Sequence, residues 1–428
     1  MLGFETVTQS LVLEYRKNID LEEDIRKHLE YIMQKTSYEL KDLKIQTENL
    51  LLSDGLITVY DVKYTFYNPH YDTTHSYHVY LPQFLNDYYV ILNGMRYAFI
   101  YSFVDKPLTR FGSDSSTVKL SNMYVKFEFR NVFDETKQLQ AKFKKFTIPL
   151  LNFILGYYYV NNAFETYTDL FKYVLDKMHV KYSLNYFAAN NEKHSSIKIQ
   201  KEDQAIKILI PQENTEIIVT EFTPLQGRLL TSFKYYKVPG ILQSIFAKKT
   251  PLQARKLFAN FESVFDYQTL QDLEIDSSKE FIEQYILNDK MYYATKDLYM
   301  FTNLRTKRIA LKIFLLHPLI RQLSMILQYW YIDKGSRLPK KHTVTLAILY
   351  KIMQIELAEG KLHNPISEVA LNCKVTYMNK FAIKRRSANT RLIPSDMLGI
   401  ICPISTPETQ KVGAVNWLVL VPNIKFDK

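Results

Sequence analysis

Residues 396–420 read DMLGIICPISTPETQKVGAVNWLVL, and this stretch is the most informative in the chain. Two apolar runs flank a polar loop that contains Pro403 and Pro407. Each proline fixes its own φ angle and biases the preceding residue towards extended geometry, so the sequence predicts a stiff, non-helical loop between two core strands. Glu408 is the single carboxylate on this loop. It suits the positioning of a neighbouring group, and the alternative is a turn with Glu408 in solvent.

A basic strip precedes the loop. Residues 369–395 contain no acidic side chain, and Tyr377 and Phe381 lie among six basic residues: Lys374, Lys380, Lys384, Arg385, Arg386 and Arg391. Guanidinium groups bind phosphate through two hydrogen bonds, and aromatic rings stack on bases. The strip therefore indicates contact with nucleic acid, and the alternative is a solvated loop neutralised by the carboxylates of a partner.

The composition is that of a folded, basic protein. Of the 428 residues, 47% are hydrophobic and 14% are aromatic, which excludes general disorder. The formal net charge of +11 fits either a solvated basic surface or a polyanionic partner.

Cys373 and Cys402 form no disulfide framework or CxxC pair, so we expect a reducing compartment. The N-terminus lacks a secretion signal, and the most apolar window, 146–160, is too short to span a bilayer. These features predict a soluble intracellular protein.

Apolar periodicity predicts an α+β architecture with closely joined domains. Alternation predicts one hairpin at 56–80 and another at 88–103, which turns at Asn93-Gly94 because both residues tolerate positive φ. Further strands are expected at 125–130, 197–200, 205–210 and 216–222. Helical spacing predicts helices that start at Asp20 and cover 252–262, 278–287, 309–331 with an interruption at Pro318, and 343–360.

Motifs for a complete catalytic site are absent from the sequence. There is no phosphate-binding glycine loop, no HExxH, no GxSxG and no cluster of aspartates suited to the Mg²⁺ ions of nucleotidyl transfer. His70, His75 and His78 lie near Asp72 on alternating positions across a turn, which favours ordinary strand histidines over a metal site. We therefore expect no catalytic residue and no metal ligand in this chain.

The loop and the basic strip resemble a known family. Residues 402–409, CPISTPET, with Gly413 and Asn416, resemble the CPxETPEG…G…N segment of the second-largest, β-type subunit of multisubunit DNA-directed RNA polymerases. The preceding segment of that family is matched by five positions: Arg385, Arg386, Arg391, Pro394 and Ser395. Weaker resemblances follow the family's order at 80–100, 124–130, 144–158 and 303–316. Ser405 and Thr409 depart from the family pattern, in place of a Glu and a Gly.

The resemblance implies the N-terminal portion of a β subunit, closest to the split β subunits of giant bacteriophages. It implies a multi-domain α+β fold with mixed sheets and helices, in which 1–164 form the first part of the protrusion and 165–330 the lobe. Residues 331–375 would return to the protrusion, and 376–428 would form the fork region leading to the active centre. We expect a subunit that helps to form the DNA/RNA channel and active-site wall, inactive as an isolated chain. The alternative is a non-enzymatic DNA-binding or assembly protein derived from a polymerase fragment.

The resemblance also implies partners and candidate site residues. We expect a C-terminal β-type chain, β′-type chains, a sigma-like promoter-recognition factor, template DNA and RNA product, in the host cytoplasm or the virion. Mg²⁺ would be bound by another subunit. The resemblance implies that eight residues contact nucleic acid or form the active-site wall: Lys384, Arg385, Arg386, Arg391, Pro407, Glu408, Lys411 and Asn416. Lys411 falls where bacterial enzymes have an Asn that lines the rifampicin pocket, which implies resistance of the assembled enzyme.

Overall fold

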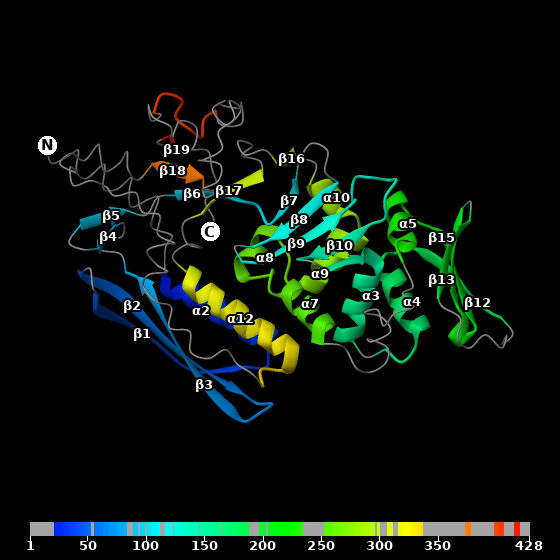
Figure 1. The fold of residues 1–428 in the computed structure, drawn as a ribbon, viewed down its shortest axis with the longest axis horizontal. Coiled ribbons are helices and arrows are strands. Elements are labelled where there is room, and N and C mark those ends of the chain that lie inside the picture. The colour runs from blue at the N-terminus through cyan, green and yellow to red at the C-terminus, as the bar shows by residue number, and fades with distance from the viewer. Residues whose placement is uncertain are drawn as a thin grey trace. The chain divides into compact units, whose positions relative to one another are not determined.

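The computed structural model describes most of the chain and divides it into two compact units (Figure 1). The described residues are 21–52, 55–83, 89–92, 95–98, 101–111, 116–122, 124–144, 146–162, 164–187, 197–202, 204–233, 252–295, 298–299, 306–310, 316–336, 373–377, 398–405 and 415–419. Unit 1 comprises Met1–Lys106 and Met300–Lys428, and unit 2 comprises Pro107–Tyr299. Both combine helices with sheets, which confirms the predicted α+β class. The division into protrusion, lobe and fork stays a prediction.

A three-stranded antiparallel sheet covered by two helices forms the main core of unit 1. Its strands, in the order β1-β2-β3, are β1 (Glu39–Leu52), β2 (Gly55–Asn68) and β3 (Thr73–Pro82), which confirms the predicted first hairpin. The helices are α2 (Leu21–Lys35) and α12 (His317–Asp333), which contact each other and the sheet (Figure 1). The alternating residues Val62, Tyr64 and Phe66 of β2 are buried because they share one face of the strand.

The C-terminus of α12 is fastened to the turn between β2 and β3. The Asn68 side-chain amide donates to the Lys334 carbonyl (3.1 Å), and the Tyr71 hydroxyl donates to the Asp333 carbonyl (3.1 Å). These bonds satisfy carbonyls that a helix end leaves without internal partners. Gly335 follows with a φ of +80°, a conformation that glycine adopts without steric cost.

The predicted helix at 309–331 is wrong at its start. Residues 309–310 belong to the strand β17 (Lys307–Ala310), and Pro318 lies in the first turn of α12 rather than interrupting it. Proline is tolerated there because the first turn has no intrahelical acceptor for its missing N–H. The predicted helix at 343–360 lies outside the described residues.

Unit 1 also contains a short hairpin and a four-stranded sheet. The hairpin consists of β4 (Tyr89–Leu92) and β5 (Met95–Ala98), with Leu92 opposite Met95, which confirms the predicted pairing of these strands, while Asn93-Gly94 lie outside the described residues. The four-stranded sheet has the order β17-β6-β18-β19 and adds β6 (Tyr101–Asp105), β18 (Lys374–Tyr377) and β19 (Val415–Trp417) to β17.

Unit 2 is built on a six-stranded sheet of order β11-β10-β9-β8-β7-β16. Its strands are β7 (Leu108–Phe111), β8 (Thr117–Ser121), β9 (Lys126–Arg130), β10 (Gln140–Phe143), β11 (Phe146–Pro149) and β16 (Leu298–Tyr299). One face packs on helices that include α3 (Leu150–Asn161) and α7 (Leu252–Glu262). Phe127 of β9 lies 5.2 Å from both Phe153 and Phe261, measured between ring centroids, so aromatic side chains fill this core.

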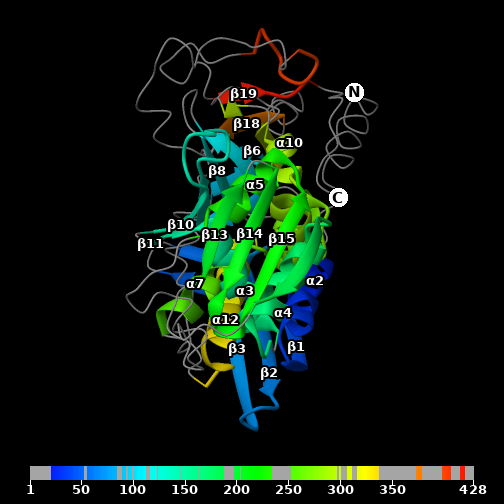
Figure 2. The same ribbon diagram turned by 90° about the vertical axis from the view of Figure 1, so that its right-hand side faces the viewer.

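The remaining elements of unit 2 surround this core. The helices are α4 (Tyr167–Lys177), α5 (Pro224–Thr231), α8 (Tyr267–Leu273), α9 (Ser278–Phe281), which continues as a π-helical turn (Ile282–Leu287), and α10 (Lys290–Ala294). A second sheet has the order β12-β15-β14-β13 and consists of β12 (Lys181–Tyr186), β13 (Lys198–Glu202), β14 (Ala205–Ile210) and β15 (Thr215–Glu221) (Figure 2). The three strands predicted between 197 and 222 are confirmed.

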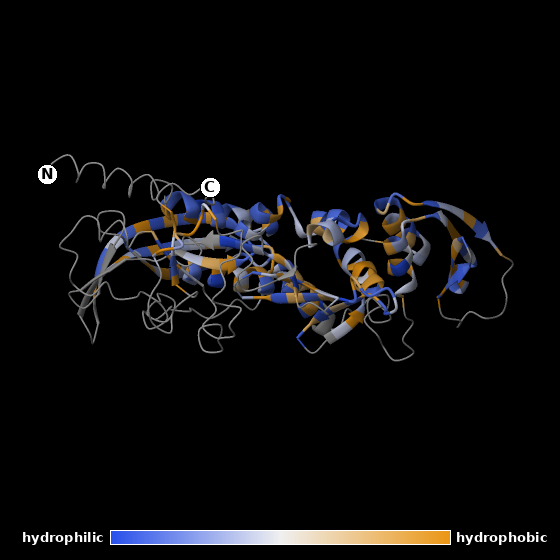
Figure 3. Ribbon diagram, turned by 90° about the horizontal axis from the view of Figure 1, so that it is seen from above, coloured by the Kyte–Doolittle hydropathy of each residue, from blue (hydrophilic) through white to orange (hydrophobic). Residues whose placement is uncertain are grey.

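Both hydrophilic and hydrophobic residues occur along the helices and strands (Figure 3). This pattern is typical of elements with one buried face. No helix within the described ranges combines the length and apolarity needed to cross a membrane.

Candidate functional site

The four-stranded sheet of unit 1 brings together segments that are far apart in the sequence. β17 runs antiparallel to β6, with Lys307 opposite Asp105, and β18 runs parallel to β6, with Thr376 opposite Ser102. β19 runs antiparallel to β18, with Asn416 opposite Val375, whose side chain is fully buried. Four segments that begin at residues 101, 307, 374 and 415 therefore form one sheet.

The loop predicted from the two prolines is anchored to β19. The Cys402 N–H donates to the Trp417 carbonyl (2.8 Å), and the Val419 N–H donates to the Ile400 carbonyl (3.0 Å). Ile401 and Leu418 form a β-bridge between these two bonds. Gly399 adopts a φ of +75°, which allows the chain to turn before the bridge. The described part of the loop, 398–405, is therefore non-helical, as predicted.

This anchored segment exposes apolar side chains. Leu398 is 70% exposed and Ile404 is 88% exposed, while Ile401 between them is buried.

The two cysteines have different environments on either side of β19. The Leu418 N–H donates to the Cys373 carbonyl (2.7 Å), and burial raises the pKa of the Cys373 thiol. Hydrogen bonds from the Ser405 side chain, and then from the backbone of Ser405 and Ile404, lower the pKa of the Cys402 thiol. Both cysteines are free thiols, consistent with the absence of a disulfide framework in the sequence.

Asn416 is a predicted site residue that the structure describes. Its side chain is only 6% exposed, and its Nδ2 atom has no hydrogen-bond acceptor in the part of the chain that the structure describes. A buried donor without an acceptor costs about 1–3 kcal/mol, so such groups are rare outside sites with a specific role. Asn416 remains a predicted site residue.

The sheet also contains an ion pair between a buried lysine and an exposed aspartate that the sequence did not reveal. The Lys307 ammonium group pairs with the Asp105 carboxylate across β17 and β6, and the Lys307 side chain is 3% exposed. Burial lowers the pKa of Lys307, whereas Asp105 opposes this shift. Since the partners are about 200 residues apart in sequence, only the strand register brings them together. Between β18 and β19, the Lys374 ammonium group lies 5.8 Å from the centre of the Trp417 ring.

The other predicted site residues lie outside the described residues. These are Lys384, Arg385, Arg386, Arg391, Pro407, Glu408 and Lys411. They remain sequence predictions, and the described sheet and loop border them in the chain on both sides.

The histidines near Asp72 take part in ordinary contacts. His78 contacts the carboxylate of the buried Asp61, which also forms an ion pair with Lys63 at 2.6 Å. The His75 ring nitrogen lies 2.9 Å from the Thr73 hydroxyl. Within the described residues, no three histidine, cysteine, aspartate or glutamate side chains are grouped so that they could hold a metal ion.

One comparison with known proteins identifies a related domain. Residues 361–424 match the family model for RNA polymerase Rpb2, domain 3. This segment includes β18, the anchored loop, β19 and all eight predicted site residues. The match indicates a second-largest, β-type subunit of a multisubunit RNA polymerase. No curated protein matches the chain.

Proposed function

We propose that this chain belongs to a β-type subunit and helps to form the DNA/RNA channel and the active-site wall of a DNA-dependent RNA polymerase. The observation that carries the proposal is the match of residues 361–424 to Rpb2 domain 3. Within this matched segment, the described strands β18 and β19 belong to a four-stranded sheet. The other two strands, β6 and β17, come from other parts of the chain. The matched domain is therefore integrated into unit 1.

The proposed contribution of this chain is structural. The loop at 398–405 is fixed to β19 by hydrogen bonds on both sides of the Ile401–Leu418 bridge, so the chain continues towards Pro407 and Glu408 from a fixed point. A fixed wall aligns reacting groups at no further entropic cost during the reaction. Lys384, Arg385, Arg386 and Arg391 would neutralise nucleic-acid phosphates, which is the main source of affinity in such contacts.

The chemistry would belong to the assembled enzyme. Mg²⁺, held by a β′-type chain, would supply the charge that activates nucleotidyl transfer, and this chain would supply no metal ligand. The remaining partners in the proposal are a C-terminal β-type chain and a sigma-like factor, in the cytoplasm of a phage-infected host. These partners are those implied by the resemblance to a β-type polymerase subunit.

Co-expression with the partner chains tests the proposal. A stoichiometric complex that synthesises RNA from a promoter-containing template, and loses synthesis when this chain is omitted, is the expected result. A soluble monomer that binds DNA and assembles with none of these chains would contradict the proposal and favour the non-enzymatic alternative.

A further inference from the structure

The six-stranded sheet of unit 2 has two chemically different faces. One face carries the aromatic core, where Val118 and Leu120 of β8 and Phe127 and Phe129 of β9 are fully buried. Because the side chains of a strand point alternately to the two faces, the residues between these belong to the opposite face. The strand register aligns one row of the opposite face across β7 to β11: Thr109, Lys119, Glu128, Lys142 and Thr147.

The face opposite the aromatic core is rich in cations. It carries four cationic side chains and one carboxylate, which we call the basic face: Lys119, Lys126, Arg130, Lys142 and Glu128. Lys126 is exposed, and the side chains of Arg130 and Lys142 are 38% and 27% exposed. Glu128 contacts both Arg130 (3.5 Å) and Lys142 (3.7 Å). One carboxylate therefore faces four cations, and the face keeps a net positive charge.

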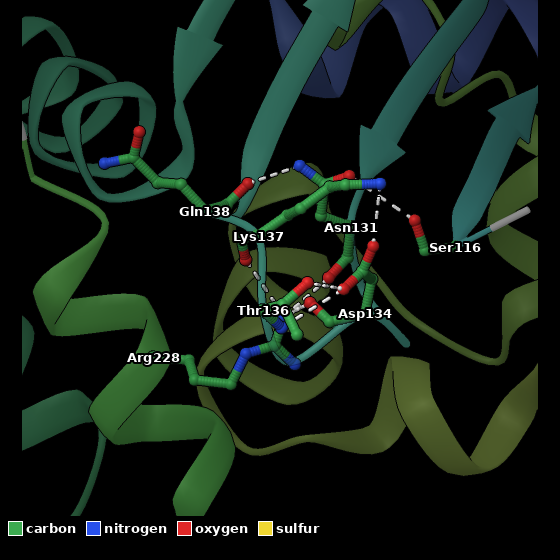
Figure 4. Close-up of polar contacts among 7 residues, drawn as sticks. All are labelled: Ser116, Asn131, Asp134, Thr136, Lys137, Gln138 and Arg228. Atoms are coloured by element: carbon green, nitrogen blue, oxygen red, sulfur yellow. Dashed lines mark hydrogen bonds and ion pairs between the residues drawn. The ribbon is translucent and has the colours of Figure 1, made fainter.

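The loop that joins β9 to β10, residues 131–138, is held by one arginine (Figure 4). Arg228 of α5 donates from Nη2 to the carbonyls of Asn131 and Asp134, both at 2.6 Å, and from Nη1 to the carbonyl of Val132 at 3.1 Å. Hydrogen bonds from a charged donor are stronger than neutral ones, so the loop is well positioned. The two strands that it joins carry three of the four cations of the basic face.

The spacing of these cations suits several phosphates rather than one small anion. Neighbouring strands lie about 4.8 Å apart, so the backbones of Lys119 and Lys142, two strands apart, are separated by roughly 10 Å. Lys126 and Arg130 are four residues apart on β9, which corresponds to roughly 13 Å. A single phosphate could reach only part of this array, whereas a nucleic-acid backbone offers charges at regular intervals across it.

We infer that the basic face binds the phosphate backbone of double-stranded nucleic acid. Cations that neutralise phosphates release condensed counterions, which supplies affinity without base contacts. A single strand gains affinity by stacking its bases on exposed rings. Within the described strands β7 to β10, the one aromatic ring of this face is Phe111, and the Lys119 ammonium group lies 3.6 Å from its centre. An acidic peptide would need a sheet edge or a groove, whereas the cations lie across the middle of a sheet.

The test measures binding of the full-length chain to a fluorescein-labelled duplex of about twenty base pairs, at salt concentrations from about 50 to 200 mM. Replacement of both Lys126 and Lys142 by Gln should weaken duplex binding by roughly tenfold and reduce the slope of log affinity against log salt by about two. The matched control replaces Lys198 and Lys201 by Gln, which removes the same charge from exposed positions on β13 of the same unit. Its affinity should stay within about twofold of wild type.

Glu128→Gln tests the inference in the opposite direction. The substitution keeps the shape of the side chain and removes the one carboxylate of the basic face, so Arg130 and Lys142 become available to phosphate. Duplex binding should become tighter by about threefold. A variant that gains affinity cannot owe its behaviour to misfolding. Unchanged or weaker duplex binding by Glu128→Gln would overturn the inference.

Lysine footprinting locates the bound duplex independently of affinity. Acetylation of lysines with and without duplex, followed by mass spectrometry, should show protection of Lys126 and Lys142 but not of Lys198 and Lys201. Absence of this protection, or equal duplex affinity in the Lys126/Lys142 variant and its control, would mean that the basic face is only solvated. Tighter binding of oligo-dT or of a polyglutamate peptide than of duplex, dependent on Lys126 and Lys142, would also overturn the inference.

This inference deepens the proposed function, on which it rests for the origin of the duplex, since transcription starts from a double-stranded template. The two can fail separately. If the chain assembles into no RNA-synthesising complex but still binds duplex through Lys126 and Lys142, the proposed function fails and the binding surface stands. If synthesis requires the chain but these lysines contribute nothing to duplex binding, the basic face fails and the proposed function stands.

Discussion

The Tyr157 hydroxyl donates a 2.7 Å hydrogen bond to the Glu262 carboxylate inside unit 2, where Glu262 is 3% exposed. Ser278 donates to the other carboxylate oxygen at 2.6 Å. These bonds connect α3, α7 and α9 around a charge that has been removed from water. A buried carboxylate of this kind is stable only while its hydrogen-bond donors are present.

Removal of one donor should therefore destabilise unit 2. Tyr157→Phe keeps the ring but removes the hydroxyl, and we expect unfolding free energy to fall by roughly 1–3 kcal/mol. Urea denaturation followed by circular dichroism measures the loss. Tyr186→Phe, at an exposed tyrosine of the same unit, should change stability by less than about 0.5 kcal/mol. Equal stabilities for the two variants would mean that the Tyr157 bond contributes nothing.

Gly335 should resist substitution because its environment excludes a side chain. A Cβ atom there would collide with the Tyr38 hydroxyl, and the φ of +80° is unfavourable for alanine. We expect Gly335→Ala to cost roughly 1–3 kcal/mol of stability. Tyr38→Phe removes the colliding oxygen and should recover part of that loss in the double variant. A simple sum of the two single effects would show that the hydroxyl is not the obstacle.

Unit 1 should lose stability in mild acid. Burial lowers the pKa of His28 to about 4, and burial together with the Arg321 charge lowers the pKa of His317 to about 4. Since an unfolded histidine titrates near 6.5, the unfolded state binds more protons between about pH 6.5 and pH 4, and stability falls as the pH falls through this range. Urea midpoints at pH 7.5 and pH 5 measure the effect. His28→Gln should reduce this pH dependence, and an unaltered slope would contradict the assignment.

Asn416 should matter more to the assembled enzyme than to the fold. Asn416→Leu removes a buried donor without an acceptor among the described residues and keeps a similar volume. Thermal unfolding of the isolated chain should therefore stay unchanged or improve slightly, because the desolvation penalty disappears. RNA synthesis by the reconstituted complex should fall by about tenfold if the amide bonds a group of the active-site wall. Unchanged synthesis would remove Asn416 from the candidate residues.

Arg391 and Glu408 should affect elongation without affecting assembly. A hydrogen bond to a charged group contributes about 1.5–3 kcal/mol, so Arg391→Ala or Glu408→Ala should slow elongation by roughly tenfold or more. The measurement is the rate of RNA extension on a preformed scaffold, with the subunit ratio of the purified complex as the control. Wild-type rates in an intact complex would remove both residues from the site.

Local signals predicted the elements whose structure is set by neighbouring residues. The Asn93-Gly94 pair and the alternation at 56–80 were sufficient because turn chemistry and strand period act over a few residues. The strand β12 was missed because its residues are mostly half-exposed or exposed, which weakens the apolar alternation. The sequence at 309–310 is as compatible with a helix as with a strand, and pairing with β6 decides between them.

The features of the candidate site could be predicted only where a sequence motif indicated them. Residues 398–405 are non-helical, as predicted, and Pro403 fixes its own φ angle and favours extended geometry at Cys402. The Lys307–Asp105 ion pair and the hydrogen bonds from Arg228 to the loop at 131–138 join segments that are far apart in the chain. The spacing of residues along the sequence does not predict such contacts. Most of the basic strip lies outside the described residues, so its role stays a prediction.

The strand order β17-β6-β18-β19 has a consequence for biosynthesis. Translation is vectorial, and domains tend to fold as they emerge from the ribosome. Residues 107–299 can complete their own core while the nascent chain still lacks three of the four strands of that sheet. β6 must then wait for more than 300 residues of synthesis before β19 is available, and during that interval a chaperone would have an exposed strand edge to protect.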